Sequence, residues 1–337
     1  MQYGVSYSDA KAIAMDVFRE NFSKLSQNAY RVATGRAEEF AENYLKELHD
    51  REPGSIRNIE DPGIQSDILE AQAGFARSGD RDLREVLTDL LVDRTARPER
   101  TIVSLTLSAA IQTAQRLTDV HFAALSSVFA FQQLKFPRMT HHEQVYENLV
   151  RCLVPFTRQM NALKDADVHY LEALGCVTLG GGNRLLEFLW ETYPGLFAEP
   201  IDVNDFPVDL EGKPLAGPHH ILKKLKNTSA VMASPRDPGK FQVSATDRDD
   251  LHQLLIDHDL LDHESELESA LRKKLSGQRV CQEIADYSED LDSVRYWNET
   301  LGLSHRANTA VGTAIGHANI SRVTKGELVG TLDFWLS

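Results

Sequence analysis

The chain has 337 residues, of which 42% are hydrophobic and 26% are charged, as is typical of globular proteins and not of disordered ones. Its 50 acidic and 36 basic side chains give a formal net charge of -14, which disfavours binding to nucleic acid or to an anionic membrane. No run of about 18 uncharged apolar residues is present, so no transmembrane helix is predicted.

The cysteine pattern indicates a reducing environment. Cys152, Cys176 and Cys281 stand far apart, their number is odd and no CxxC pair occurs. A disulfide framework or a structural zinc site is therefore not expected. Cys152 and Cys176 have apolar neighbours and resemble core thiols. With no signal peptide at the start, we expect a cytoplasmic protein without a cofactor or a bound metal ion.

After an N-terminal tail at residues 1–7, which leaves open that the sequence is truncated, a helical pattern begins. Apolar residues recur at helical spacing from Asp9 to Leu48, and few helix breakers intervene. This pattern predicts one long helix of roughly 40 residues, or about 60 Å. This long helix could kink near Gly35. The alternative is two ordinary helices with a short break between them.

A helix of that length carries an apolar stripe that one small domain cannot cover completely. Phe18, Phe22 and Leu25 lie on this stripe. We therefore expect them to form the interface of a homo-oligomer, most simply a dimer, because a symmetric pair is the commonest way to bury such a surface.

The same helical pattern continues and predicts a helical bundle over residues 8–164. Asp61 followed by Pro62 marks a helix start. Residues 101–134 contain only two charged side chains and predict two helices, 101–117 and 119–134, in the centre of the bundle or at an oligomer interface. The segment Thr140-His141-His142-Glu143 resembles a capping box, and its histidines are expected to be solvent-exposed.

Residues 165–337 differ in composition, since they hold the Gly-Gly-Gly run and most prolines. Short strands are predicted at 176–179, 240–245 and 331–336, and a helix of small residues at 308–320. The expected fold class is thus mainly α, with an α+β, winged-helix-like module in this half.

Several segments resemble one uncharacterised bacterial family that is linked to phage defence. They are the L-T-x-x-G-x-x-I-like stretch from Leu303 to Ile315, the stretches 75–80 and 87–94, and Val311–Ile320. The resemblance implies architecture and biological setting. It brings no catalytic residue to this chain.

Gly180, Gly181, Gly182 and Asn183 stand between a predicted strand and a predicted helix. Glycines in this position can let backbone amides approach a phosphate at the helix N-terminus. No GxxxxGK[ST] or GxGxxG pattern accompanies them. A flexible turn with Asn183 as the N-cap explains the same residues, so a cofactor-binding role is the weaker interpretation.

The His258-Asp259 doublet lies in a cluster of acidic residues and histidines and resembles the doublet of HD-type phosphohydrolases. As that family's metal site, it would also need an upstream histidine, either His219 or His220, and a downstream Asp286 or Asp290. A solvated acidic turn is the competing interpretation and the better supported one.

A short basic segment, residues 219–226, is the only candidate for DNA contact, and it lies in the more acidic half. We therefore expect a non-enzymatic interaction, sensor or scaffold component with an unknown protein partner, which oligomerises through its helical half in anti-phage defence. The first alternative is a metal-dependent hydrolase centred on His258 and Asp259. The second is a DNA-binding regulator.

Overall fold

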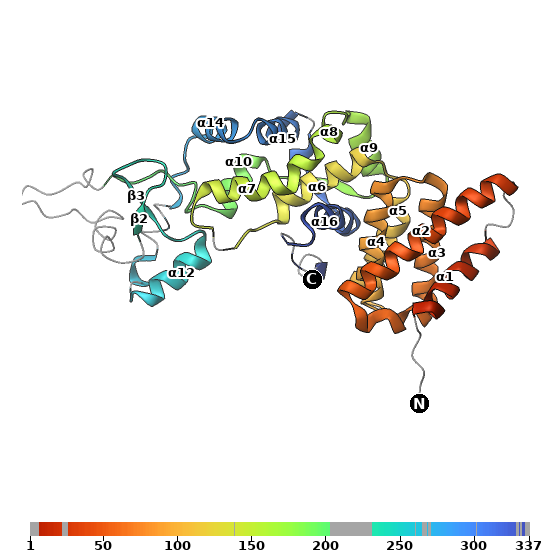
Figure 1. Cartoon of the computed structure of the whole chain (residues 1–337). Coiled ribbons are helices and arrows are strands. Elements are labelled where there is room, and N and C mark those ends of the chain that lie inside the picture. Colours follow the sequence, from red (N-terminus) through yellow and green to blue (C-terminus); the bar gives the residue numbers. More distant parts are fainter. Residues whose placement is uncertain are drawn as a thin grey trace, which may run out of the picture. The chain divides into compact units, whose positions relative to one another are not determined.

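The computed structural model describes residues 7–21, 26–137, 139–202, 231–259, 261–264, 268, 271–300, 302–327, 330 and 332–333. This part of the chain is mainly helical (Figure 1). None of its helices is both long enough and apolar enough to cross a membrane. The helices of the first half are α1 (Tyr7–Asn21), α2 (Gln27–Arg51), α3 (Pro62–Ser78), α4 (Arg81–Thr95), α5 (Ile102–Ala114), α6 (Asp119–Gln133), α7 (His142–Leu153), α8 (Thr157–Met160) and α9 (Asp165–Ala173).

The second half contains shorter elements and one long final helix. Its helices are α10 (Leu185–Thr192), α12 (Arg248–Asp257), α14 (Gly277–Tyr287), α15 (Glu289–Thr300) and α16 (Ala310–Thr324). Its strands are β1 (Val177–Leu179), β2 (Val231–Ala233), β3 (Phe241–Val243) and β4 (Arg306–Asn308).

The chain forms two compact units, and both are built from discontinuous stretches. Unit 1 contains the chain up to Gln133, Pro155–Gly182 and the chain from Glu299 onward. Unit 2 contains Leu134–Val154 and Asn183–Asn298. These units do not follow the boundary expected between residues 164 and 165. In particular, the final helix α16 belongs with the N-terminal helices.

In unit 1, α16 packs against α4, α5 and α6 (Figure 1). The small residues of α16 allow a close approach, since a Cβ atom on Gly316 would lie 2.6 Å from the backbone oxygen of Leu125. Deeper in this contact, Asn319 Nδ2 donates to Ser126 Oγ at 2.8 Å. The helix of small residues predicted near 308–320 is therefore a buried helix of unit 1.

The long first helix predicted from Asp9 to Leu48 is wrong. α1 ends at Asn21, α2 begins at Gln27, and Ser26 between them has the extended torsion ψ 151°. The break therefore precedes Gly35, which lies inside α2 with open space around it.

The apolar stripe of α1 is covered within unit 1, where α1 packs against α2 and α3. Phe18 is fully buried in a cluster with Met15, Ala33, Ala37, Ala41 and Ala76. It is a core residue and is not exposed on the surface where an interface was expected. Phe22 and Leu25 lie outside the described residues.

Helix α4, which carries much of the site described below, is fixed at both ends. Asp80 caps its first turn by accepting from the backbone N–H of Leu83 at 3.1 Å. Near its end, Arg94 Nε donates to Asp67 Oδ2 of α3 at 2.9 Å, and both side chains are buried. Tyr44 of α2 and Thr95 share a buried hydroxyl–hydroxyl hydrogen bond of 2.8 Å.

The sheets of the described residues are small. β1 pairs antiparallel with β4 in unit 1, and β2 pairs antiparallel with β3 in unit 2. Each sheet has two strands, so the winged-helix-like module is not confirmed. Leu332 and Asp333 are helical, which corrects the strand predicted at 331–336 for these two residues.

Candidate functional site

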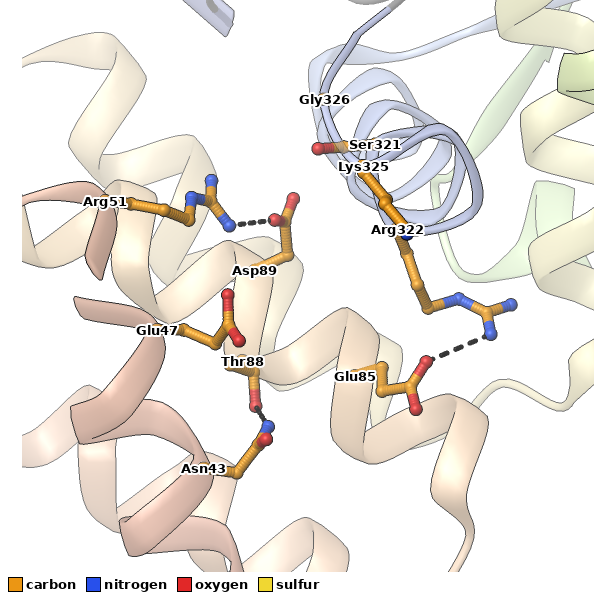
Figure 2. Close-up of a pocket in the computed structure, with 10 residues that line it drawn as sticks. All are labelled: Asn43, Glu47, Arg51, Glu85, Thr88, Asp89, Ser321, Arg322, Lys325 and Gly326. Atoms are coloured by element: carbon orange, nitrogen blue, oxygen red, sulfur yellow. Dashed lines mark hydrogen bonds and ion pairs between the residues drawn. The ribbon is translucent and has the colours of Figure 1, made fainter. Parts of the chain in front are cut away.

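A charged cleft of about 560 Å³ lies in unit 1 between α2, α4 and the end of α16 (Figure 2). Side chains from the first 90 residues of the chain here meet side chains that follow residue 320. The lining residues are Asn43, Glu47, Arg51, Glu85, Thr88, Asp89, Ser321, Arg322, Lys325 and Gly326.

One face of α2 lines the cleft. Asn43, Glu47 and Arg51 follow one another at intervals of four residues, so their side chains lie on the same side of the helix. Asn43 Nδ2 donates to Thr88 Oγ1 of α4 at 3.1 Å, and Arg51 forms an ion pair with Asp89 (Figure 2). These contacts fix α2 against α4.

The end of α16 contributes the opposite wall. Arg322 Nη1 lies 3.2 Å from Glu85 Oε2 (Figure 2). It also lies 2.9 Å from Asp82 Oδ1, so one guanidinium links α16 to α4. Lys325 adopts a left-handed conformation with φ 52°, and Gly326 follows with φ 73°. This turn ends the helix beside the cleft.

A second cavity of about 430 Å³ shares Arg51, Ser321 and Gly326 with the cleft. Two of its other charged residues, Asp93 and Asp333, form ion pairs with Arg97. Arg97 Nη1 donates to the backbone oxygen of Asp93 at 2.8 Å, and Arg97 Nε donates to Asp333 Oδ1 at 3.1 Å.

Asp89, Asp93 and His317 come together where the two cavities adjoin. One ligand atom of each residue lies within 4.8 Å of those of the other two, and in the described part of the chain these three form the group that could hold a metal ion. Burial raises the pKa of Asp89, although the charge of Arg51 opposes the shift.

The phosphate-site candidates have a structural explanation. Gly180 and Gly181 have positive φ angles of 97° and 76°, and a Cβ atom on Gly182 would lie 2.4 Å from the backbone oxygen of Ser304. The glycines are thus needed for the turn and for close contact with the segment before β4. The N-cap of α10 is Arg184, so Asn183 does not cap that helix as predicted.

The hydrolase candidates are not brought together in the described residues. His258 follows the last residue of α12, and Asp259 is exposed with φ 56°. Asp286 and Asp290 are exposed as well, and His219 and His220 lie outside the described residues. Within the described ranges, His258 and Asp259 belong to no group of three metal-binding side chains.

Unit 2 contains one histidine that sequence reasoning placed wrongly. His142 is 8% exposed, and burial and the charge of Arg236 lower its pKa to about 3. The expectation of solvent exposure is therefore wrong for His142. The N-cap of α7 is His141, and Gln144 accepts from the backbone N–H of His141 at 3.2 Å.

The cysteines predicted as core thiols are Cys152 and Cys176, and the segment considered for DNA contact is 219–226. Burial raises the pKa of Cys152 to about 12 and that of Cys176 to about 11, so both thiols stay protonated near neutral pH. Cys281 is partly exposed. The basic segment 219–226 lies outside the described residues.

Together, the fold and the cleft define a mainly helical protein with a charged, metabolite-sized cleft in one of its two units. A protein-family model matches residues 4–336, and the chain therefore belongs to that family, which is uncharacterised. No curated protein matches the chain, and no solved structure matches it.

Proposed function

We propose that the protein is a non-enzymatic sensor that binds a small charged ligand in the cleft between α2, α4 and α16. The observation that carries this proposal is the cleft itself. Its volume of about 560 Å³ lies within the range of small-molecule sites, and three cations, Arg51, Arg322 and Lys325, line it together with acidic residues.

The ion pairs of the cleft indicate the chemistry of the ligand. Arg51 is paired with Asp89, and Arg322 with Glu85. A ligand that enters must replace or extend these pairs, because breaking a partly buried pair without compensation is costly. We therefore expect a polar metabolite with charged groups of its own.

The position of the cleft supports sensing. α2 and α4 form one wall and α16 the other, so a bound ligand would stabilise the contact of α16 with α4. Ligand binding would thereby also affect the position of the segment that follows α16. The raised pKa values of Cys152 and Cys176 support a role without a nucleophilic thiol.

A thermal-shift screen tests the proposal. A panel of nucleotides, dicarboxylates, amino acids and polyamines is added to the full chain, and we expect at least one compound to raise the melting temperature. Arg322→Ala should abolish that shift because it opens one wall of the cleft. Arg31→Ala is the matched control, since Arg31 is exposed on α2 and outside the cleft. Equal shifts in both variants would contradict the proposal.

Self-association through unit 1 is the second part of the proposed function. Helix α5 contains no charged residue, and its Ile102 and Leu105 are 68% and 44% exposed. Because Phe18 is buried, we propose these two residues as the dimer contact. Light scattering should give about twice 37.8 kDa for the wild type and the monomer mass for the double variant Ile102→Glu, Leu105→Glu. A wild-type mass of 37.8 kDa at micromolar concentration would exclude the dimer.

The biological setting that we propose is anti-phage defence, which rests on the family resemblance of stretches such as Val311–Ile320. A phage stock should form fewer plaques on bacteria that express the wild-type chain than on bacteria that express the Arg322→Ala variant. Equal plaque numbers for several phages would count against this setting and leave the cleft proposal intact.

A further inference from the structure

We infer that Asp89, Asp93 and His317 bind one divalent transition-metal ion beside the proposed cleft, which Asp89 also lines. Asp89 and Asp93 lie one helical turn apart on α4, so their carboxylates share a face, and His317 reaches them from α16. One ligand atom of each lies within 4.8 Å of the others. An ion about 2.1 Å from each atom needs the three atoms at most about 4.2 Å apart, so any longer separation must close when the ion binds.

The hydrogen bonding of His317 prepares its ring for a metal ion. Nε2 lies 2.8 Å from the backbone oxygen of Gly330. A carbonyl oxygen only accepts, so Nε2 carries a hydrogen, and in this tautomer the lone pair is on Nδ1. Metal-binding histidines commonly donate their second ring N–H to a backbone carbonyl in this way.

Two buried acceptors in the cluster have no partner among the described residues. They are His317 Nδ1 and Asp89 Oδ2, and the two residues are only 5% and 6% exposed. A buried polar atom without a partner is destabilising, so such atoms are rare in folded proteins. A cation held between the imidazole nitrogen and the carboxylate oxygens would satisfy both.

The charge balance of the cluster also favours a cation. Three carboxylates, Asp89, Asp93 and Asp333, face two guanidinium groups, Arg51 and Arg97. One negative charge is left over. Arg51 opposes the entry of a cation, but its side chain is 37% exposed and can turn away from the cluster.

The donor set indicates the class of metal. One imidazole nitrogen with two carboxylates suits zinc or manganese, whereas calcium and magnesium prefer oxygen ligands alone. The neighbouring cavity of about 430 Å³ leaves room for water on the remaining coordination positions. The expectation from the sequence, which was a chain without a metal ion, is replaced by this inference.

Equilibrium dialysis against Zn²⁺ and, separately, Mn²⁺ tests it on the full chain after chelator treatment. We expect one ion per chain of at least one of the two metals, with an affinity that falls at least about tenfold in His317→Gln. His169→Gln is the matched control, because His169 lies in the same unit with a side chain that is 70% exposed. A wild type that binds neither metal, or equal binding by His317→Gln, would overturn the inference.

A second variant guards against misfolding, because His317 is buried. The Asp93 side chain is 18% exposed, so Asp93→Asn should fold and should lose the rise in melting temperature that the metal gives the wild type. An unchanged rise would overturn the metal site. If neither metal binds while a metabolite shift still depends on Arg322, the metal inference fails and the proposed function stands. If a metal binds and no metabolite does, the proposed function fails and the metal inference stands.

Discussion

Two buried histidines beside carboxylates, one in each unit, show how charge balance separates a structural cluster from a candidate cation site. In unit 2, His142 Nε2 lies 3.9 Å from Glu283 Oε2, and Arg236 Nε lies 3.0 Å from the same oxygen. Arg279 pairs with Asp237 at 2.8 Å. Each of these carboxylates therefore has a guanidinium partner.

In unit 1, the carboxylates around His317 outnumber the guanidinium groups by one, and buried acceptors are left without partners among the described residues. A cation near His142 would meet Arg236 and Arg279, and one near His317 would meet Arg51 and Arg97. His142 Nδ1 and His317 Nδ1 are both buried without a partner among the described residues. The His317 cluster differs because it also has a buried carboxylate oxygen without a partner there, Asp89 Oδ2. Proximity of histidine to an acid is common to both clusters. The clusters differ in the balance between carboxylates and guanidinium groups, and this balance decides where a bound cation is expected.

The largest effect is expected when α16, which carries His317, is displaced from α6. Gly316→Ala places a Cβ atom 2.6 Å from the Leu125 backbone oxygen, which α16 can avoid only by moving away from α6. We expect a loss of about 3 kcal/mol in the free energy of unfolding, measured by chemical denaturation, and a loss of metal binding at His317.

Gly35→Ala provides the control for that change. Gly35 lies inside α2 with nothing within 4 Å of an added Cβ atom, so the same substitution should stabilise the protein by about 0.5–1 kcal/mol. If both variants have the same unfolding free energy, close packing does not hold α16 in place.

The next largest effect concerns the unit 2 cluster and its response to acid. The pKa of His142 is lowered from 6.5 to about 3 by burial, with Arg236, His141 and Arg279 adding to the shift. The unfolded chain therefore takes up a proton near pH 6.5 while the folded chain does not, so stability is full above pH 6.5 and falls as the pH drops toward 3.

At pH 5 this difference amounts to about 2 kcal/mol. Denaturation curves at pH 7.5 and pH 5 should show that the wild type loses this much more stability than His142→Gln, which cannot titrate. The side chain of His142 is 10% exposed, so solvent screens the effect little. Identical pH dependence in the two proteins would show that His142 is protonated in the folded state.

A third test changes the charge balance in unit 1. Arg51→Gln removes one of the two cations that compete with a metal ion, so we expect Zn²⁺ affinity to rise about tenfold, or about 1.4 kcal/mol. Isothermal titration calorimetry measures it, with Arg31→Gln as the control on the same helix. Weaker binding in Arg51→Gln would mean that Arg51 orients Asp89 for the metal.

The smallest effect is expected at the edge of the cluster. Asp333 is paired with Arg97, and the hydrogen bond from Arg97 lowers the pKa of Asp333. Because the Asp333 side chain is 56% exposed, Asp333→Asn should cost less than about 1 kcal/mol in thermal or chemical unfolding. A larger loss would show that the segment after α16 is a structural part of unit 1.

Local signals predicted much of the helical structure correctly. Asp61 followed by Pro62 does start α3, and the charge-poor stretch does form α5 and α6. These features depend on residues within one or two turns of each other. The position of the break between α1 and α2 could not be predicted in the same way, because no glycine or proline stands there.

The cluster in unit 1 was missed for a related reason. His317 is more than 220 residues from Asp93, and no local spacing links them. One signal was available: Asp89 lies among Leu87, Leu90 and Leu91, on a helix whose apolar residues predict burial. A buried carboxylate needs a partner, which would have led to a search for distant cations or metal ligands.

The place of α16 in the fold has a consequence for how the chain folds during its synthesis on the ribosome. Helices α4, α5 and α6 leave the exit tunnel long before α16, because the residues of unit 2 are translated in between. Until α16 arrives, the faces that it will cover, including that around Leu125, are not covered by it. A nascent chain of this kind is a natural client for chaperones that bind apolar helices, and the need for them should end as Thr324 emerges.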